Sequence, residues 1–221
     1  MAKTVDEVRG RLASSLGRRD ELPNIALARE IARKGDGRAV RALTTCLEDP
    51  DRGVRHDAIK VLYEIGAERP QLIAPYAGTF IDHLSNASNR TVWGAMTALG
   101  AIAPVRGKAI GTRIDEVIAA TSRGSVITQD WGIRTIAAVA ARDPALRDRL
   151  LRYLFAFIAR CAPRDVPKHA ASISIAVDGR QRGRFVAVLR ARERELTRAQ
   201  LSRLRKVYRD LLDSAPLHSR Q

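Results

Sequence analysis

The sequence predicts an all-α protein built from repeated pairs of short helices. Apolar residues recur every three or four positions along nearly the whole 221-residue chain, and no sustained period-two alternation appears. Helix-start signals, at which Asp, Asn, Ser or Thr precedes an apolar run, return at short intervals. Pieces of sequence also recur at a spacing of 38 residues, which is typical of repeat arrays.

The helix starts can be placed one by one. Thr4 and Glu7 form a capping box, and the apolar stripe that follows is Val5, Val8, Leu12 and Leu16. Later helices are expected to begin near Asn24, Asp36, Asp51, Pro70, Asn89, Lys108, Ser125, Asp143, Asp165 and Arg180. Thr197 and Gln200 form a second capping box, which opens a last helix with the apolar stripe Leu201, Leu204, Val207, Tyr208 and Leu211.

The repeat spacing indicates that the helices come in pairs. Asp51 and Asn89 lie 38 residues apart, and Trp93-Gly94 is echoed 38 residues later by Trp131-Gly132. Small residues on the first helix of each pair predict a close approach between neighbouring pairs.

Two segments carry a resemblance to a known family. They read Asp51-x-x-Val54-Arg55-x-x-Ala58-x-x-x-Leu62 and Asn89-x-x-Val92-x-x-Ala95-x-x-Ala98-Leu99-Gly100. With this period, residues 24–195 resemble the HEAT-repeat (armadillo-like helical repeat) family. The resemblance implies a right-handed α-solenoid that binds partners through an extended surface. Trp93 stands where the previous repeat has Arg55, so the family's Asp–Arg ladder is complete only once.

We expect about five helix pairs within one domain, residues 1–221. The pairs are placed at about 22–49, 50–85, 87–122, 124–161 and 163–195. A capping helix over 1–21 precedes them, and a capping helix with a short tail over 196–221 follows.

The charge of the chain is concentrated at its C-terminal end. The formal net charge is +15, and 11 basic but only two acidic residues lie between Arg180 and Arg209. This stretch is interpreted either as a solvated cap or as a surface for an acidic partner, which is a negative protein surface or nucleic acid. The candidate polyanion-binding residues are Arg180, Arg182, Arg184, Arg190, Arg194, Arg198, Arg205 and Arg209.

The two tryptophans occupy equivalent places in adjacent repeats. Trp93 and Trp131 either fill the junctions between repeats or, with Arg90 and Arg134 nearby, form a stacking platform for a base or a partner side chain. They are therefore candidate partner-surface aromatics.

No residue pattern indicates an enzyme. No two His or Cys residues lie at metal-ligand spacing, and no phosphate-binding or nucleophile motif is present, so we expect no catalytic residue, cofactor or metal. Cys46 and Cys161 are expected to be buried thiols, and His56-Asp57 to lie on a solvated helix face. A DNA-alkylation-repair-like glycosylase using Asp130, Trp131 and Arg134 is a minor alternative.

The sequence therefore predicts a non-enzymatic protein-binding scaffold. No apolar stretch reaches signal-peptide or membrane-spanning length, which favours a cytoplasmic protein without a membrane partner. Sequence-independent nucleic-acid binding through the basic C-terminal stretch is the second candidate.

Overall fold

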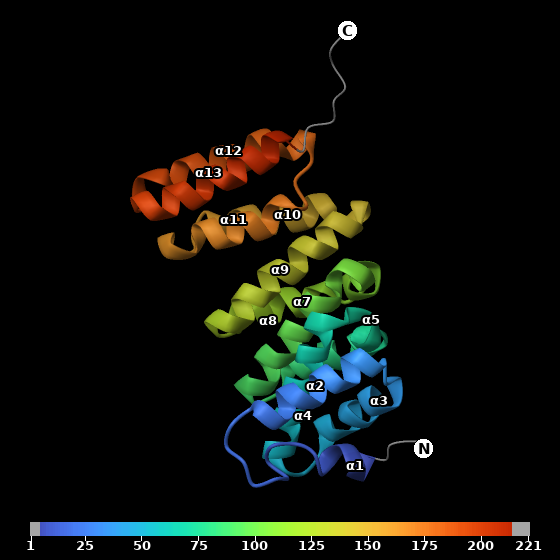
Figure 1. Ribbon diagram of the computed structural model, residues 1–221. Coiled ribbons are helices and arrows are strands. Elements are labelled where there is room, and N and C mark those ends of the chain that lie inside the picture. The colour runs from blue at the N-terminus through green and yellow to red at the C-terminus, as the bar shows by residue number, and fades with distance from the viewer. Residues whose placement is uncertain (1–4, 214–221) are drawn as a thin grey trace. The chain divides into compact units, whose positions relative to one another are not determined.

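The computed structural model describes residues 5–213, which fold almost entirely into helices (Figure 1). The described residues are 83% helical, and no strand occurs among them. The helices group into two compact units, residues 1–135 and residues 136–221, each described here by itself. The all-α prediction is confirmed, whereas the single domain over 1–221 stays a prediction.

Unit 1 contains three successive helix pairs and the start of a fourth. Its elements, with 3₁₀ turns labelled η, are α1 Val5–Arg9, α2 Leu22–Lys34, α3 Gly37–Thr45, η1 Cys46–Glu48, α4 Arg52–Glu68, α5 Pro70–Ile73, η2 Ala74–Tyr76, α6 Ala77–Asp82, η3 His83–Ser85, α7 Asn89–Gly111 and α8 Ile114–Arg123. The helix α9, Val126–Arg142, crosses the division between the units at residue 135.

Unit 2 contains four further helices after the end of α9. They are α10 Pro144–Ile158, η4 Pro163–Asp165, α11 Val166–Ser174, α12 Gly179–Arg192, η5 Glu193–Glu195 and α13 Arg198–Asp213. The helix boundaries follow the five pairs expected from the sequence, with α13 as the terminal helix.

Acidic side chains fix the start of many helices. Asp36 accepts a hydrogen bond from the Ala39 amide at 2.9 Å, and Asp51 accepts one from the Gly53 amide at 2.6 Å. In unit 2, Asp143 caps α10 and Asp178 caps α12 in the same way. These bonds satisfy amides that have no partner within the helix, so the predicted starts at the first three of these Asp residues are confirmed.

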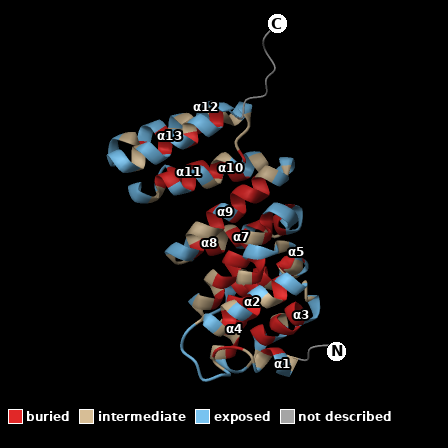
Figure 2. Ribbon diagram, viewed as in Figure 1, coloured by how far each residue is buried: buried red, intermediate tan, exposed pale blue. Residues whose placement is uncertain are grey.

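The core of unit 1 lies between first helices of successive pairs, and α4 packs between α2 and α7 (Figure 2). Leu62 and Leu99 are fully buried there. A Cβ added at Gly94 would lie 2.7 Å from Ile59, so only glycine allows α7 to approach α4 this closely. The predicted close approach at small residues is confirmed at this position.

The N-terminal segment differs from its prediction. The helix α1 ends at Arg9, and Leu16 is 53% exposed, so the expected stripe does not continue to that residue. Thr4, half of the first capping box, lies outside the described residues. Polar groups hold the chain after α1: the Ala13 amide donates to Asn24 at 3.0 Å, and the Ser14 amide donates to Asp57 at 2.7 Å.

The interpretation of Asp57 as part of a solvated face is wrong. This side chain is 8% exposed, and its second oxygen accepts a hydrogen bond from Asn24 Nδ2 at 2.8 Å. A buried carboxylate is stable only when it is hydrogen-bonded, and here a backbone amide and a side-chain amide provide the bonds. Its neighbour His56 is half-buried and bonded to Ser88 at 2.9 Å.

Two second helices depart from the expected simple form. The second helix of the second pair is divided into α5, η2, α6 and η3, with Pro75 inside η2. The helix expected to start near Lys108 begins after a kink at Arg106 (φ −128°, ψ 22°), where α7 joins two helical segments, and α8 continues it after a break at residues 112–113. Pro104 precedes the bend, and a proline inside a helix removes one backbone donor and crowds the preceding turn.

In unit 2, α11 packs against α13, and α10 packs against α12. Phe155 and Phe185 stack at 5.1 Å between ring centroids. Leu204 and Leu211 are buried on the inner face of α13 as predicted. The second capping box is also confirmed, because the Thr197 amide donates to Gln200 at 2.7 Å and the Gln200 amide donates to Thr197 Oγ1 at 3.4 Å.

Candidate functional site

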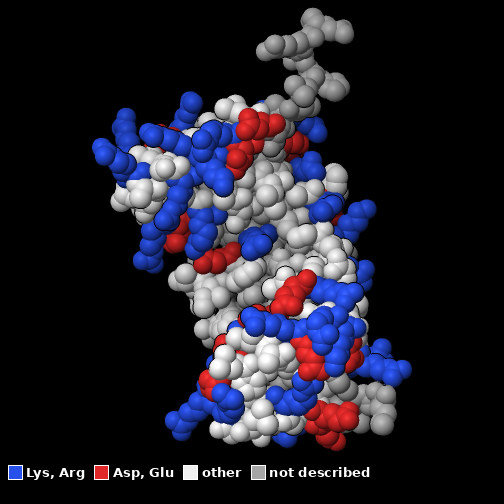
Figure 3. Space-filling view, in the orientation of Figure 1, with Lys and Arg blue, Asp and Glu red and all other residues white. Residues whose placement is uncertain are grey.

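Seven arginines at the C-terminal end, on α12, η5 and α13, are exposed. We call this set the C-terminal arginine surface and define it by Arg180, Arg184, Arg190, Arg194, Arg198, Arg205 and Arg209. Figure 3 shows Lys and Arg side chains crowded over these helices. The sequence analysis names each of these seven arginines as a candidate polyanion-binding residue.

On α13 the predicted stripe is present. Arg198, Arg205 and Arg209 follow one another at spacings of seven and four residues, which places them on one side of a helix. Leu204 and Leu211 are buried on another side of it. Arg203 and Lys206 are also exposed on α13, and the sequence interpretation had left them out.

Arg182 lies apart from the other candidates. It is half-buried, and its Nε atom is buried without a hydrogen-bond partner among the described residues. The Arg184 guanidinium, although exposed, lies 5.9 Å from the centroid of the Phe155 ring. The beginning of α12 thus uses part of its basic side chains for packing.

The two acidic residues of this stretch are bonded to other groups. Glu193 accepts a hydrogen bond from the Tyr208 hydroxyl at 2.7 Å, and Glu195 pairs with Arg192 at 2.8 Å. Burial raises the pKa of Tyr208, and the bond to Glu193 raises it further. Arg147, Lys168 and Arg192 form ion pairs within unit 2, with Asp178, Asp165 and Glu195 respectively.

Arg192 has a structural position that the sequence interpretation missed. It is 7% exposed and donates to the backbone carbonyls of Ile158 and, at 2.8 Å, Cys161. These carbonyls lie at the end of α10, where helices leave acceptors without partners. The signal was present in the sequence, because Phe185, Leu189 and Arg192 follow the helical period of a buried face.

The tryptophans are half-buried in unit 1. Trp93 contacts Tyr63 at 5.7 Å between ring centroids, and its predicted neighbour Arg90 is paired with Glu21 at 2.7 Å. Trp131 packs so close to Gly100 that a Cβ added there would lie 2.5 Å from the indole ring.

Trp131 also has a cationic neighbour. The Arg134 guanidinium lies 4.9 Å from the centroid of the indole ring. Trp131 therefore makes a packing contact, as expected for a residue that fills a junction between repeats. It also contacts a cation, as expected for a stacking platform.

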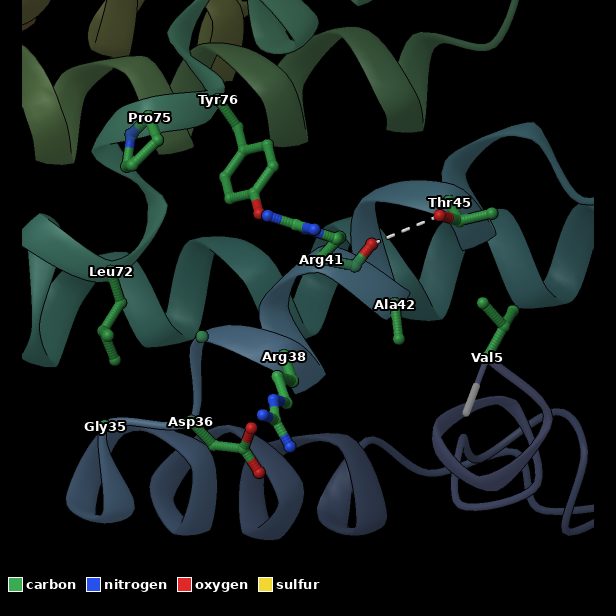
Figure 4. A pocket seen from close by; sticks show the side chains of 11 residues that line it. Val5, Gly35, Asp36, Arg38, Arg41, Ala42, Thr45, Leu72, Pro75 and Tyr76 are labelled. Atoms are coloured by element: carbon green, nitrogen blue, oxygen red, sulfur yellow. Dashed lines mark hydrogen bonds between the residues drawn. The ribbon is translucent and has the colours of Figure 1, made fainter. Parts of the chain in front are cut away.

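A pocket of about 950 Å³ lies in unit 1 beside α3 (Figure 4). Its lining includes Arg38 and Arg41 of α3 and Tyr76 of η2. No local sequence pattern indicates this pocket, because its walls come from separate helices and the turn between α2 and α3. We call it the α3 pocket.

The two cysteines and the buried His169 carry groups that can bind a metal ion or act as nucleophiles. Within residues 5–213 no group of three metal-ligating side chains is present. Cys46 and Cys161 are free, and burial raises the pKa of both thiols, which disfavours the reactive thiolate. Cys46 is buried as predicted, whereas Cys161 is only half-buried. His169 is buried, with its ring edge-on to Phe157.

None of the helices in the described part of the chain has the length and apolar character that crossing a bilayer requires.

Sequence comparisons find no relative. No protein-family model matches the chain, and no curated protein matches it.

Solved structures with similar folds exist. An engineered protein has a TM-score of 0.62 and 16% identity, with 95% of each chain covered. A designed armadillo repeat protein in complex with the peptide (KR)₄ has a TM-score of 0.64 and 12% identity, covering 95% of this chain and all of that one. Kap121p bound to Pho4p has a TM-score of 0.65 and 14% identity over 92% of this chain.

The aligned region is only 23% of the Kap121p chain. At these identities the likeness carries the fold and not the function. The chain therefore has an all-α solenoid fold similar to that of armadillo and karyopherin helical repeat proteins.

Proposed function

We propose that this chain is a non-enzymatic scaffold of the HEAT type that binds an acidic surface of another protein. The observation that carries the proposal is the C-terminal arginine surface, whose seven arginines are exposed, while Glu193 and Glu195, the two acidic residues between Arg180 and Arg209, are bonded to Tyr208 and Arg192. Complementary charge steers association and selects partners of opposite sign.

The kind of ligand follows from the fold and the charge together. Similar structures include a designed armadillo repeat protein with a basic peptide and Kap121p with Pho4p, which favours a protein or peptide ligand. This chain carries a net charge of +15, so we expect a partner of the opposite sign. Arginine suits such a surface, because its planar fork donates two parallel hydrogen bonds to one carboxylate.

The test is capture from nuclease-treated lysate with the full chain immobilised. We expect the retained proteins to carry acidic segments. We also expect the triple variant Arg198→Gln, Arg205→Gln, Arg209→Gln to lose most of them.

The matched control removes three exposed arginines from unit 1, by Arg19→Gln, Arg33→Gln and Arg52→Gln. It should retain the same proteins as the unchanged chain. Equal losses in the two triple variants would show that only the total charge matters, and retention by both would contradict the proposal.

Sequence-independent binding to nucleic acid is the second candidate for the same surface. Tyr208 is half-buried and Phe185 is buried, so base stacking has no support here, whereas phosphate contacts need only the guanidinium groups. About four contacts would give a slope of roughly −3.6 in log affinity against log salt. The Arg198/Arg205/Arg209 variant should then lower that slope by about three units in a titration of duplex DNA.

The glycosylase alternative has a separate test. Trp131 and Arg134 are in contact, but a catalytic role for Asp130 has no support beyond its place in the sequence. Release of alkylated bases from DNA, abolished by Asp130→Asn, would replace the scaffold proposal with this enzyme.

The free thiols of Cys46 and Cys161 support a reducing compartment, and we propose that the protein is cytoplasmic.

A further inference from the structure

The α3 pocket has the properties of a second binding site, separate in sequence from the C-terminal arginine surface. Its lining comes from four places: Val5 of α1, the turn Gly35–Gly37, the helix α3, and the stretch of α5 and η2 from Leu72 to Tyr76. A pocket walled by several elements persists only while those elements stay packed, so it belongs to the folded unit 1.

The lining divides into an apolar part and a basic part. Val5, Ala42, Leu72 and Pro75 supply the apolar part. Arg38 and Arg41 lie three residues apart on α3, which places them on the same side of the helix, and both are exposed. A ligand with both apolar and anionic groups can therefore contact both parts at once.

The donors of the basic part converge. Figure 4 shows the Arg41 side chain and the Tyr76 ring pointing toward one another across the pocket. Guanidinium and phenol groups both donate hydrogen bonds, and Arg and Tyr are residue types that dominate binding energy at protein interfaces.

The negative charge in the lining is smaller than the positive charge. Asp36 is the one acidic residue among the pocket's lining residues, and one of its oxygens accepts from the Ala39 amide as the cap of α3. With two arginines and one aspartate, the lining keeps a net charge of +1, and Arg41 is the cation that faces Tyr76.

We propose that the α3 pocket binds an extended peptide segment of a partner protein in which acidic and apolar side chains alternate. The volume of about 950 Å³ accommodates several side chains, and the pocket is open to solvent, which suits a chain that enters and leaves. A segment in which acidic and apolar side chains alternate offers both kinds of group within a few residues, so its carboxylates can contact Arg38 and Arg41 while its apolar side chains contact residues such as Leu72 and Pro75. This inference rests on the proposal that the chain is a protein-binding scaffold.

The probe is a fluorescein-labelled (Glu-Leu)₄ peptide, titrated with the full chain and followed by fluorescence anisotropy. To remove binding elsewhere, the background carries the Arg198/Arg205/Arg209→Gln substitutions. We expect saturable binding that weakens at least tenfold on adding Arg38→Gln and Arg41→Gln, and at least tenfold when the peptide is (Gln-Leu)₄.

Two further variants separate binding from folding. Arg19→Gln with Arg52→Gln removes the same charge from exposed positions outside the pocket and should change the affinity less than twofold. Tyr76→Phe removes only the phenol oxygen and should weaken binding about threefold, with an unchanged circular dichroism spectrum. A charge reversal, Arg38→Glu with Arg41→Glu, should shift the preference to (Lys-Leu)₄.

The outcomes distinguish the two proposals. If (Glu-Leu)₄ binds the unchanged chain but not the Arg198/Arg205/Arg209 background, the pocket inference fails and the arginine surface stands. If the peptide binds the background equally well with and without Arg38 and Arg41, the pocket inference also fails. Loss of acidic partners from lysate with the Arg198/Arg205/Arg209 variant, measured separately, tests the proposed function alone.

Discussion

The two units of the chain use their charged side chains in different ways. Residues 1–135 hold 20 basic and 16 acidic side chains, whereas residues 136–221 hold 19 basic and eight acidic ones. In unit 1, ion pairs join segments that are far apart in sequence, such as Arg9 with Asp49 at 2.8 Å and Arg113 with Asp82 at 2.7 Å.

In unit 2, Arg147 and Asp178 form a comparable long-range pair at 3.4 Å. Pairs such as Lys168 with Asp165, and Arg192 with Glu195, join residues only three apart. Apart from Arg184, which lies over the Phe155 ring, we therefore expect the exposed arginines of α12 and α13 to add little to the packing of unit 2. Like charges that do not stabilise the fold are available to bind a partner. Four predictions test this difference between the two units.

The largest effect is expected in the core of unit 1. Leu99 is fully buried on α7, and Leu99→Ala should lower the free energy of unfolding by about 2–5 kcal/mol through lost burial and a residual cavity. Both tryptophans lie in unit 1, so urea unfolding followed by their fluorescence reports on this unit. Leu22→Ala, at a position 64% exposed on α2 in the same unit, is the control and should change stability by less than about 0.5 kcal/mol.

The next effect concerns the one buried arginine of α12. Arg192→Met should cost about 2–4 kcal/mol, because the carbonyls of Ile158 and Cys161 lose their donor. Circular dichroism at 222 nm follows this loss, since no tryptophan lies in residues 136–221. Arg190→Met removes an exposed arginine from the same helix and should be nearly neutral. Equal losses of stability in the two variants would contradict the distinction between Arg192, which is bonded to backbone carbonyls, and the exposed arginines of α12.

A smaller effect depends on pH and belongs to unit 1. Hydrogen bonds from Arg11 and then Lys34 hold the pKa of Glu30 down to about 2. A carboxyl whose folded pKa is depressed contributes stability above its unfolded pKa, near 4.5, and loses it as the pH falls toward 2. The difference in stability between the unchanged chain and Glu30→Gln should therefore shrink from about 1 kcal/mol to near zero across that range. A constant difference would show that the ion pairs do not stabilise the fold.

The smallest effect is expected for the substitutions that should matter most for binding. Changing Arg198, Arg205 and Arg209 together to Gln should alter the free energy of unfolding by less than about 0.5 kcal/mol, because all three side chains are exposed. Urea unfolding followed by circular dichroism measures this change. A loss of more than 1 kcal/mol would mean that the arginines of unit 2 support its packing.

Much of the fold could be predicted because helix caps and apolar periodicity are local signals. Asp36, Asp51 and Asp143 each begin a helix where the sequence indicated. The early end of α1 could not be predicted in the same way. The apolar stripe after it continued in the sequence, but the chain follows hydrogen bonds to Asn24 and Asp57 instead.

The candidate sites show the same division between local and distant signals. The arginine stripe of α13 could be read from spacing alone, because exposure on one helix follows its own period. The α3 pocket depends on residues as far apart as Val5 and Tyr76, which no local pattern connects. Arg192 was an intermediate case, in which the period placed it on the buried face but its charge suggested exposure.

The position of Arg192 also has a consequence for the order in which unit 2 is made. The end of α10 is completed by a side chain that follows Ile158 by 34 residues and Cys161 by 31. During synthesis from the N-terminus, the carbonyls at the end of α10 lack their Arg192 donor until α12 has left the ribosome and packed against α10. The two helices therefore reach their final form together, and a nascent chain that stops before residue 192 leaves the end of α10 unfinished.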